Sequence, residues 1–317
     1  MIKKIILAIG ICFICANWVK PGLVYAQSQS ADENVVVVEN KKELFDALGV
    51  QIKEHKEEVI YDTYDGILGK DLQKVFDEYY FYHNADDLLN SGSYLGRYVK
   101  GGEMETGCGD FSGNHNRRIK VRLEYMYEKQ DMDEYFRTME EMANQLKRES
   151  DFESVKAVHD YLINNYDYDE QYKNYLDYEG YLNGTMVCQG YCMAAFLLLA
   201  EMDIPVRIVT GSSQDYQADA NHAWNVVKVD GQWYNMDVTW DDKGGKKRPD
   251  YTFFLKSDTE FYKHTREGWY DYDRDMAIVS YPMPNHSNVG VLLIVMVGIV
   301  IYILFLYIRR KNDFTHI

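Results

Sequence analysis

A two-residue turn between two runs of alternating apolar residues constrains this sequence more than any other feature. Asp230-Gly231 separates residues 222–229, HAWNVVKV, from residues 232–240, QWYNMDVTW. A type I′ turn needs positive φ at both central positions, and Asp-Gly is a favoured pair for it. The pattern therefore predicts a β-hairpin in which Val229 pairs with Gln232, and this pair fixes all the others.

The predicted register gathers chemically useful side chains on one face of the hairpin. Trp224 is expected opposite Asp237, and His222 opposite Thr239. Side chains alternate along a strand, so His222, Trp224 and Asp237 project from the same face. His222 and Asp237 are then diagonal neighbours, at a spacing where a carboxylate reaches an imidazole. The hairpin thus supplies a general base and the group that orients it.

A cysteine at the start of an apolar helix supplies a nucleophile. After Cys188, residues 194–200 read AAFLLLA and leave no polar face, which is typical of a helix that crosses the core. Unpaired N–H groups at a helix start and a protonated histidine nearby both favour the thiolate. We therefore predict a catalytic triad of Cys188, His222 and Asp237, with the Cys188 backbone N–H as one oxyanion donor. A buried cysteine taken alone is more often inert, which is our interpretation of Cys192.

Two long segments carry a family resemblance. Residues 187–211, VCQGYCMAAFLLLAEMDIPVRIVTG, and 221–242, NHAWNVVKVDGQWYNMDVTWDD, closely resemble the transglutaminase-like domain. The nearest branch is the bacterial and fungal one likened to cytokinesis-associated transglutaminase/protease proteins. VHDYLINNYDYD upstream and YTFFLKSDTEFYKH downstream also resemble it, so the likeness spans about residues 152–265.

The resemblance implies a papain-like α+β fold and acyl chemistry through a cysteine thioester. By this resemblance Cys188 is the nucleophile, His222 the base and Asp237 the third member. The chain departs from the family pattern at Cys192, where a small residue such as alanine is usual. This departure touches none of the three catalytic positions.

The two ends of the chain predict export and anchoring. Residues 1–26 contain two lysines, an apolar run and a VYA sequence, the pattern of a cleaved signal peptide; an uncleaved anchor is the alternative. Residues 289–308 are twenty residues without a charge, and a basic segment, 309–317, follows. This pattern predicts a transmembrane helix with a cytoplasmic tail. We expect a single-pass protein of the cell membrane with an extracellular ectodomain.

Periodicity outlines the elements between the ends. It predicts strands near residues 35–38, 59–61, 119–127 and 206–209, and helices near 41–53, 132–147 and 153–164. Residues 62–118 show no clear period. The predicted domains are an N-terminal region of unknown role at 27–150, the transglutaminase-like domain at 151–280 and a tether at 281–288. The predicted fold class is α+β, with a papain-like core, a mixed α/β N-terminal region and a C-terminal transmembrane helix.

Charge and cysteine count narrow the partners. A net charge of −16 and a sequence pI near 4.9 argue against nucleic acid, since no basic stripe replaces phosphate counterions. Outside the signal peptide the chain has three cysteines, too few for a disulfide framework and without a zinc spacing. A bridge between Cys108 and Cys192 is left open. We predict no cofactor.

Several conspicuous residues have a structural alternative. Adjacent Asp241 and Asp242 after a strand are more typical of a turn than of a metal site, so we predict no metal. His159 and His264 are interpreted as structural. Trp224, Trp233 and Trp240 could line a substrate groove, although core packing is the commoner role. Of the three, Trp224 is the one on the same face as His222 and Asp237.

Two functions fit these patterns. The first is an extracytoplasmic, membrane-anchored cysteine enzyme that performs acyl transfer or amide hydrolysis on a surface protein or cell-wall peptide. The alternative is a non-catalytic surface module that uses the same fold to bind peptides or polysaccharides. The intact Cys-His-Asp set favours the enzyme.

Overall fold

The structure is a computed structural model that describes residues 22–23, 35–64, 72–111, 115–215, 218–244, 249–267, 275–283 and 302. The chain divides into two compact units, residues 1–280 and 281–317. All elements discussed below belong to the first unit. It contains both the N-terminal region and the segments that carry the family resemblance.

A five-stranded sheet dominates the N-terminal region. Its strands, in spatial order, are β1 (Gly22–Leu23), β4 (Val99–Cys108), β5 (Arg117–Tyr125), β3 (Glu58–Thr63) and β2 (Val35–Val37). Helix α1 (Lys41–Lys53) begins where the sequence predicts, because the Asn40 side chain accepts the backbone N–H of Glu43 as an N-cap. From α1 the buried Gln51 donates to the backbone oxygen of Val121 on β5, so this helix packs on the sheet.

The segment without a sequence period forms short elements that join this region to the rest of the unit. They are α2 (Leu72–Tyr80), η2 (Leu88–Asn90), α3 (Gly92–Leu95) and η3 (Gly96–Tyr98). The hydroxyls of Tyr94 and Tyr98 both donate to the buried carboxylate of Asp177. Arg97 Nη1 donates to Gln189 Oε1 over 2.9 Å. These long-range contacts hold α3 and η3 in place.

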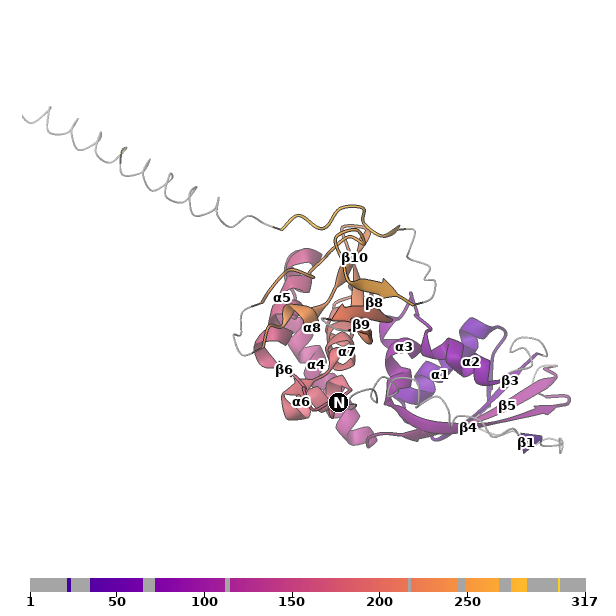
Figure 1. The fold of residues 1–317 in the computed structure, drawn as a ribbon. Coiled ribbons are helices and arrows are strands. Elements are labelled where there is room, and N and C mark those ends of the chain that lie inside the picture. Colours follow the sequence, from indigo (N-terminus) through magenta and orange to yellow (C-terminus); the bar gives the residue numbers. More distant parts are fainter. Residues whose placement is uncertain are drawn as a thin grey trace, which may run out of the picture. The chain divides into compact units, whose positions relative to one another are not determined.

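A buried helix and an antiparallel sheet form the centre of the remainder (Figure 1). Helix α7 (Cys188–Ala200) has all thirteen of its residues buried. It packs against β8 (Val206–Asp215) and β9 (Ala218–Val229) on one side. Helices α4 (Lys129–Leu146), α5 (Asp151–Asn165) and α6 (Asp177–Asn183) also contact it. The four-stranded sheet runs β10 (Gln232–Met236), β9, β8, β11 (His264–Arg266). The small strands β6 (Asp167–Tyr168) and β7 (Thr185–Met186) lead into α7.

The predicted hairpin register is confirmed as far as the ladder extends. Gln232 pairs with Val229 and Met236 with Asn225, and both turn residues, Asp230 and Gly231, have positive φ. The expectation that the second strand continues to residue 240 is wrong, because the chain leaves the sheet at Asp237 and forms α8 (Val238–Asp241). Asp237 accepts the backbone N–H of Trp240 and so caps this helix.

The C-terminal transmembrane helix in the predicted fold class is corrected by the structure. Across the described residues, no helix is both long and apolar enough to cross a membrane. Apart from residue 302, the predicted span 289–308 lies outside the described residues. An uncharged run meets the hydropathy requirement alone, whereas a span also needs one unbroken helix that pairs its own backbone groups. The fold class of the described residues is mixed α/β, and no membrane-spanning helix is found among them.

Other terminal predictions fall largely on residues that the structure does not describe. Of the predicted signal peptide, 1–26, only Gly22–Leu23 is described, and of the tether, 281–288, only residues 281–283. The tail at 309–317 lies wholly outside the described residues. These segments, and the location they imply, stay predictions.

Candidate active site

Three separate elements bring the predicted triad together. Cys188 is the first residue of α7, His222 lies on β9, and Asp237 stands between β10 and α8. His222 Nε2 is 2.7 Å from Asp237 Oδ2. The relative exposures of the three residues are 8%, 6% and 1%, so water is nearly excluded from the contact.

The thiol and the imidazole form a polarised pair. Burial would raise the pKa of the Cys188 thiol, but the hydrogen bond and positive charge of His222 outweigh it, with help from the Ala223 backbone N–H. The pKa of Cys188 therefore lies below its ordinary value. Burial alone would lower the pKa of His222, yet the charge of Asp237, its hydrogen bond and the contact with Cys188 raise it to about 10. Since Nε2 faces Asp237, Nδ1 is the nitrogen left for the thiol.

Asp237 is built to stay ionised. Burial disfavours its charge, but the charge and hydrogen bond of His222, joined by those of His264, hold the pKa of the carboxyl below its usual range. Its other oxygen, Oδ1, accepts the Trp240 N–H at 3.0 Å. The cap that ends the strand early is thus also part of the site.

His264 is the residue of this site whose place the sequence does not reveal. Its Nε2 lies 3.0 Å from Asp237 Oδ2, the same oxygen that contacts His222. The residue lies on β11, which pairs with β8 through His264↔Ser213. That pairing joins segments about fifty residues apart, with the β9–β10 hairpin and α8 between them, so no local signal reports it.

Trp224 is placed in the core. It is 1% exposed, its Nε1 donates to Asn235 Oδ1 over 3.2 Å, and its ring lies 6.0 Å from that of His222. Val209, Val226 and Phe253 belong to the same apolar cluster. This placement favours the packing role that the sequence left open for Trp224, while contact with a substrate stays a prediction.

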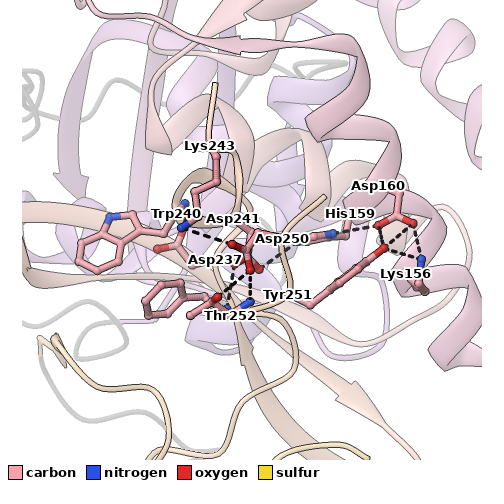
Figure 2. A network of polar contacts seen from close by, with 11 residues as sticks. Lys156, His159, Asp160, Asp237, Trp240, Asp241, Lys243, Asp250, Tyr251 and Thr252 are labelled. Atoms are coloured by element: carbon pink, nitrogen blue, oxygen red, sulfur yellow. Dashed lines mark hydrogen bonds and ion pairs between the residues drawn. The ribbon is translucent and has the colours of Figure 1, made fainter. Parts of the chain in front are cut away.

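A second buried contact between a histidine and a carboxylate, His159 with Asp241, lies at the C-terminal end of α8. His159 on α5 contacts Asp241 Oδ2 through Nε2 and Asp160 Oδ1 through Nδ1, each at 3.2 Å. Figure 2 shows this chain of contacts running on to Lys156 and Tyr251. Both nitrogens of His159 are therefore occupied by carboxylates, which agrees with the structural role predicted for it.

Asp241 ties α8 to the segment that follows it. Asp241 Oδ1 accepts the backbone N–H of Phe253, and the oxygen of Phe253 accepts the N–H of Asp237. Phe253 is thus hydrogen-bonded to both ends of α8, through Asp237 and through Asp241. The neighbouring Asp242 accepts from the hydroxyl of Tyr191 at 2.7 Å.

The other two described cysteines are free and unlike Cys188. Cys192, one turn along α7, is buried, and burial together with the charge of Cys188 raises the pKa of its thiol well above the ordinary value. Cys108 lies exposed on β4. The bridge between Cys108 and Cys192 that the sequence left open is not formed.

Within the described residues, His222, Asp237 and His264 are a group with three potential metal-ligating atoms, which lie within 4.8 Å of one another. The contacts of 2.7 and 3.0 Å are hydrogen-bond distances, and they satisfy the shared oxygen by N–H donors. We therefore describe the group as a hydrogen-bonded cluster.

Comparisons with known proteins bear on the same residues. Residues 140–238 match the family model of the transglutaminase-like superfamily, and this range contains Cys188, His222 and Asp237. No curated protein matches the chain.

Similar solved structures include a candidate cysteine protease of Cytophaga hutchinsonii, at 15% identity over 43% of this chain and 62% of that one, with a TM-score of 0.30. A TGase has 16% identity over 57% and 60%, with a TM-score of 0.28. The periplasmic domain of TgpA from Pseudomonas aeruginosa has 16% identity over 40% and 55%, with a TM-score of 0.28. The chain thus covers less than two thirds of each of these structures, and likeness at these scores carries no inference about its activity. The family match alone identifies residues 140–238 as a domain of the transglutaminase-like superfamily.

Proposed function

We propose that this chain is a thiol-dependent enzyme that transfers or hydrolyses acyl groups through a Cys188 thioester, with His222 and Asp237 completing a triad. One observation carries the proposal: the thiol at the start of α7 lies beside the His222 imidazole, which lowers the pKa of the thiol, and Nε2 of that imidazole is 2.7 Å from a buried carboxylate. This order of nucleophile, base and orienting group is what cysteine acyl chemistry requires.

The first half-reaction begins with the ion pair. The Cys188 thiolate attacks the carbonyl carbon of an amide, and the carbonyl oxygen becomes an oxyanion to which the backbone N–H of Cys188 donates a hydrogen bond. The His222 imidazolium then gives its proton to the departing nitrogen, the C–N bond breaks and an amine leaves. The products are a thioester on Cys188 and a neutral His222.

The second half-reaction restores the pair. Neutral His222 takes a proton from the acceptor, either water or a primary amine, as its oxygen or nitrogen attacks the thioester carbonyl. Collapse breaks the C–S bond, releases an acid or a new amide, and returns the thiolate beside the imidazolium. Throughout, Asp237 keeps its charge and holds the ring of His222, so the carboxylate itself does not take up the proton.

For the substrate we propose a protein or peptide amide, on the residues that resemble the family and on the chemistry of the thiol. Water as acceptor would make the chain a peptidase or amidase, and a lysine-type amine would make it a cross-linking enzyme. The same site serves both, because the acyl half-reaction is common to them.

The test uses the purified full chain with two substrate sets. Casein with a fluorescent primary amine reports acyl transfer, and a peptide library read by mass spectrometry reports hydrolysis. We expect activity in one set, loss in Cys188→Ala, and retention in the matched variant Cys192→Ala, which removes the neighbouring thiol. Wild-type inactivity in both sets, or activity that survives Cys188→Ala, would contradict the proposal and favour a non-catalytic binding module.

A further inference from the structure

Asp237 has more donors than a triad needs. In a Cys-His-Asp arrangement one imidazole on the carboxylate is sufficient. Here Oδ2 contacts both His222 Nε2 at 2.7 Å and His264 Nε2 at 3.0 Å, while Oδ1 accepts the Trp240 N–H. We propose that His264 is a positioning residue that locks the Asp237 carboxylate and so fixes the ring of His222 against Cys188. The inference rests on the proposed function of that triad.

The ring of His264 is held in one orientation. It stacks on Phe261 with ring centroids 4.0 Å apart, and the rings of Trp240 and Trp224 lie 4.6 and 5.2 Å away. The His264 side chain is only 1% exposed. An imidazole enclosed by three aromatic rings cannot swing away from Asp237 without disrupting the packing around it.

Both nitrogens of His264 face atoms that accept. Nε2 faces the Asp237 carboxylate, and Nδ1 lies 3.2 Å from the backbone oxygen of Tyr262. A carboxylate and a carbonyl oxygen offer no proton, so the ring satisfies both contacts only by donating from both nitrogens. Such a ring carries a positive charge, which acts together with that of His222 on the same carboxylate oxygen, Asp237 Oδ2. With the thiolate and the His222 imidazolium, the buried cluster then holds two negative and two positive groups.

The close approach of β11 that brings His264 in depends on a glycine. Gly211 on β8 pairs with His222 on one side and with Arg266 on the other. A Cβ at Gly211 would lie 2.1 Å from the backbone oxygen of Thr265 and 2.9 Å from the Trp224 ring. Only a residue without a side chain at this position lets β11, which carries His264, pair so closely with β8, the neighbour of the strand that carries His222.

Other charged groups on the neighbouring elements have their contacts elsewhere. On β11, Arg266 forms a two-pronged contact with Asp258, with both distances 2.7 Å. Lys263 lies with its Nζ 5.9 Å from the centre of the Trp240 ring. Facing the carboxylate from β9 is His222, and beyond it, on α7, is Cys188. Among these groups, His264 is the one that contacts Asp237 in addition to His222.

The decisive variants separate the donor of His264 from its packing. His264→Phe keeps a ring in the aromatic cage and removes the donor, whereas His264→Gln places an N–H near the position of Nε2. Phe261→Leu is the matched control, because it removes the stacked ring and leaves the donor. Each full-length variant is tested by the rate of Cys188 alkylation with iodoacetamide from pH 4 to 9, read by mass spectrometry.

Loss of the His264 donor should disfavour the thiolate form of Cys188. Without His264 the negative potential at Asp237 rises, so thiolate formation at Cys188 moves to higher pH. We expect the half-maximal pH of alkylation in His264→Phe to rise by roughly one unit, with a roughly tenfold lower rate on the acid side. His264→Gln restores a donor but no positive charge and should recover part of this shift, and Phe261→Leu should show none. An unchanged profile in His264→Phe, or equal shifts in Phe and Gln variants, would overturn the inference.

A second measurement tests the inference independently of turnover and of thiol reactivity. In ¹⁵N-histidine NMR we expect His264 to be protonated on both ring nitrogens, and its Nε2 signal to move when Asp237 becomes Asn. A His264 signal typical of a neutral ring, or one indifferent to Asp237→Asn, would reject the positioning role. If instead the NMR result holds while the chain shows no turnover, the proposed function fails and the contact remains established.

Discussion

At each end of helix α8 an aspartate contacts a histidine, but the surroundings of the two pairs differ. The Asp237 cluster comprises His222, Asp237 and His264, and the Asp241 cluster comprises His159, Asp160 and Asp241. His222 with Asp237 and His159 with Asp241 are all buried, and the two aspartates are four positions apart at the two ends of α8, so neither burial nor residue type distinguishes the two pairs. The difference lies in what faces the second nitrogen of the histidine.

That second contact separates a reactive site from a structural one. His222 turns its remaining nitrogen to a thiol, whereas His159 turns its own to a second carboxylate. An imidazole held by acceptors on both sides has no nitrogen with which to activate a nucleophile or to pass on a proton. A buried His-Asp pair is therefore evidence of a site only when the third group is a nucleophile.

The pKa values of the two carboxyl groups, Asp237 and Asp241, shift in opposite directions for the same reason. Asp237 has two imidazole donors, and the pKa of its carboxyl falls below the usual range. For Asp241, burial raises the pKa to about 6, since His159 opposes it only in part and the charge of Asp237 adds to it. The two ends of α8 should thus respond differently to mutation and to pH.

The largest expected effect comes from removing the charge of Asp237. In Asp237→Asn, His222 loses its orienting partner, and turnover should fall by about 10⁴-fold, the size seen when the acidic member of a triad is replaced by its amide. Asp241→Asn should lower turnover no more than roughly tenfold, because Asp241 does not contact the reacting groups. Steady-state assays on verified folded protein, well below the melting temperature, measure both. Equal losses in the two variants would abolish the functional distinction between the ends of α8.

A large effect on stability should come from the other end. His159→Phe leaves Asp241 and Asp160 without their imidazole, and breaking such a buried pair costs about 3–5 kcal/mol of unfolding free energy. His159→Gln can still donate to one carboxylate and should cost clearly less. Urea unfolding measures the loss. A His159→Phe variant of wild-type stability but without turnover would mean that this cluster, too, serves catalysis.

How far the sequence predicts this site can be judged along the hairpin. The Asp-Gly turn fixes the register because the conformation it needs is local, and the ladder from Gln232 to Met236 follows from it. The contact between His222 and Asp237 was expected between two strands. It forms instead where the second strand has ended, because the Asp237 side chain caps a helix.

The parts that the sequence does not predict depend on distant partners. Helix α1 is read correctly because its cap and apolar stripe are local. In contrast, Tyr94 and Tyr98 lie on elements of three or four residues whose contacts are with Asp177, about eighty residues away. His264 reaches Asp237 only through the pairing of β11 with β8. A pattern-based reading has no access to such pairings.

The pH dependence of stability should separate the two clusters by sign. A group with a raised folded pKa contributes stability below its unfolded pKa and loses it as pH rises through the folded value. For Asp241 this window runs from about 4 in the unfolded chain to about 6 in the folded one. The pKa of His159 is also raised, by its bonds to Asp160 and Asp241 against burial, so its contribution declines in the same direction above about pH 6.5. The unfolding free energy lost in Asp241→Asn should therefore be larger at pH 4 than at pH 7, by roughly 3 kcal/mol.

Asp237 gives the opposite sign. Its folded pKa is lowered, so the stability that it contributes is present above about pH 4 and is lost as pH falls. The loss in Asp237→Asn should therefore shrink below pH 4, where that in Asp241→Asn is greatest. Urea titrations of both variants and wild type at several pH values provide the comparison. Parallel curves for the two variants would contradict the opposite pKa shifts of Asp237 and Asp241.

The smallest effect concerns two thiols that repeat the same contrast on α7. Cys188 and Cys192 are both buried and one turn apart, but only Cys188 contacts an imidazole, and the pKa of Cys192 is raised well above its ordinary value. Brief exposure of the folded chain to iodoacetamide at pH 6 should therefore alkylate Cys188, while Cys192 stays unmodified until the chain is unfolded. Exposed Cys108 serves as the internal reference for an accessible thiol without such a partner.

Cys192→Ala removes one sulfur atom from a packed helix and should lower the unfolding free energy by about 1–2 kcal/mol. It should leave the alkylation rate of Cys188 within about twofold, since Cys192 donates nothing to the thiolate. A marked fall in the Cys188 rate in this variant would show that the two thiols act together, and the imidazole would then no longer suffice to explain which of them reacts.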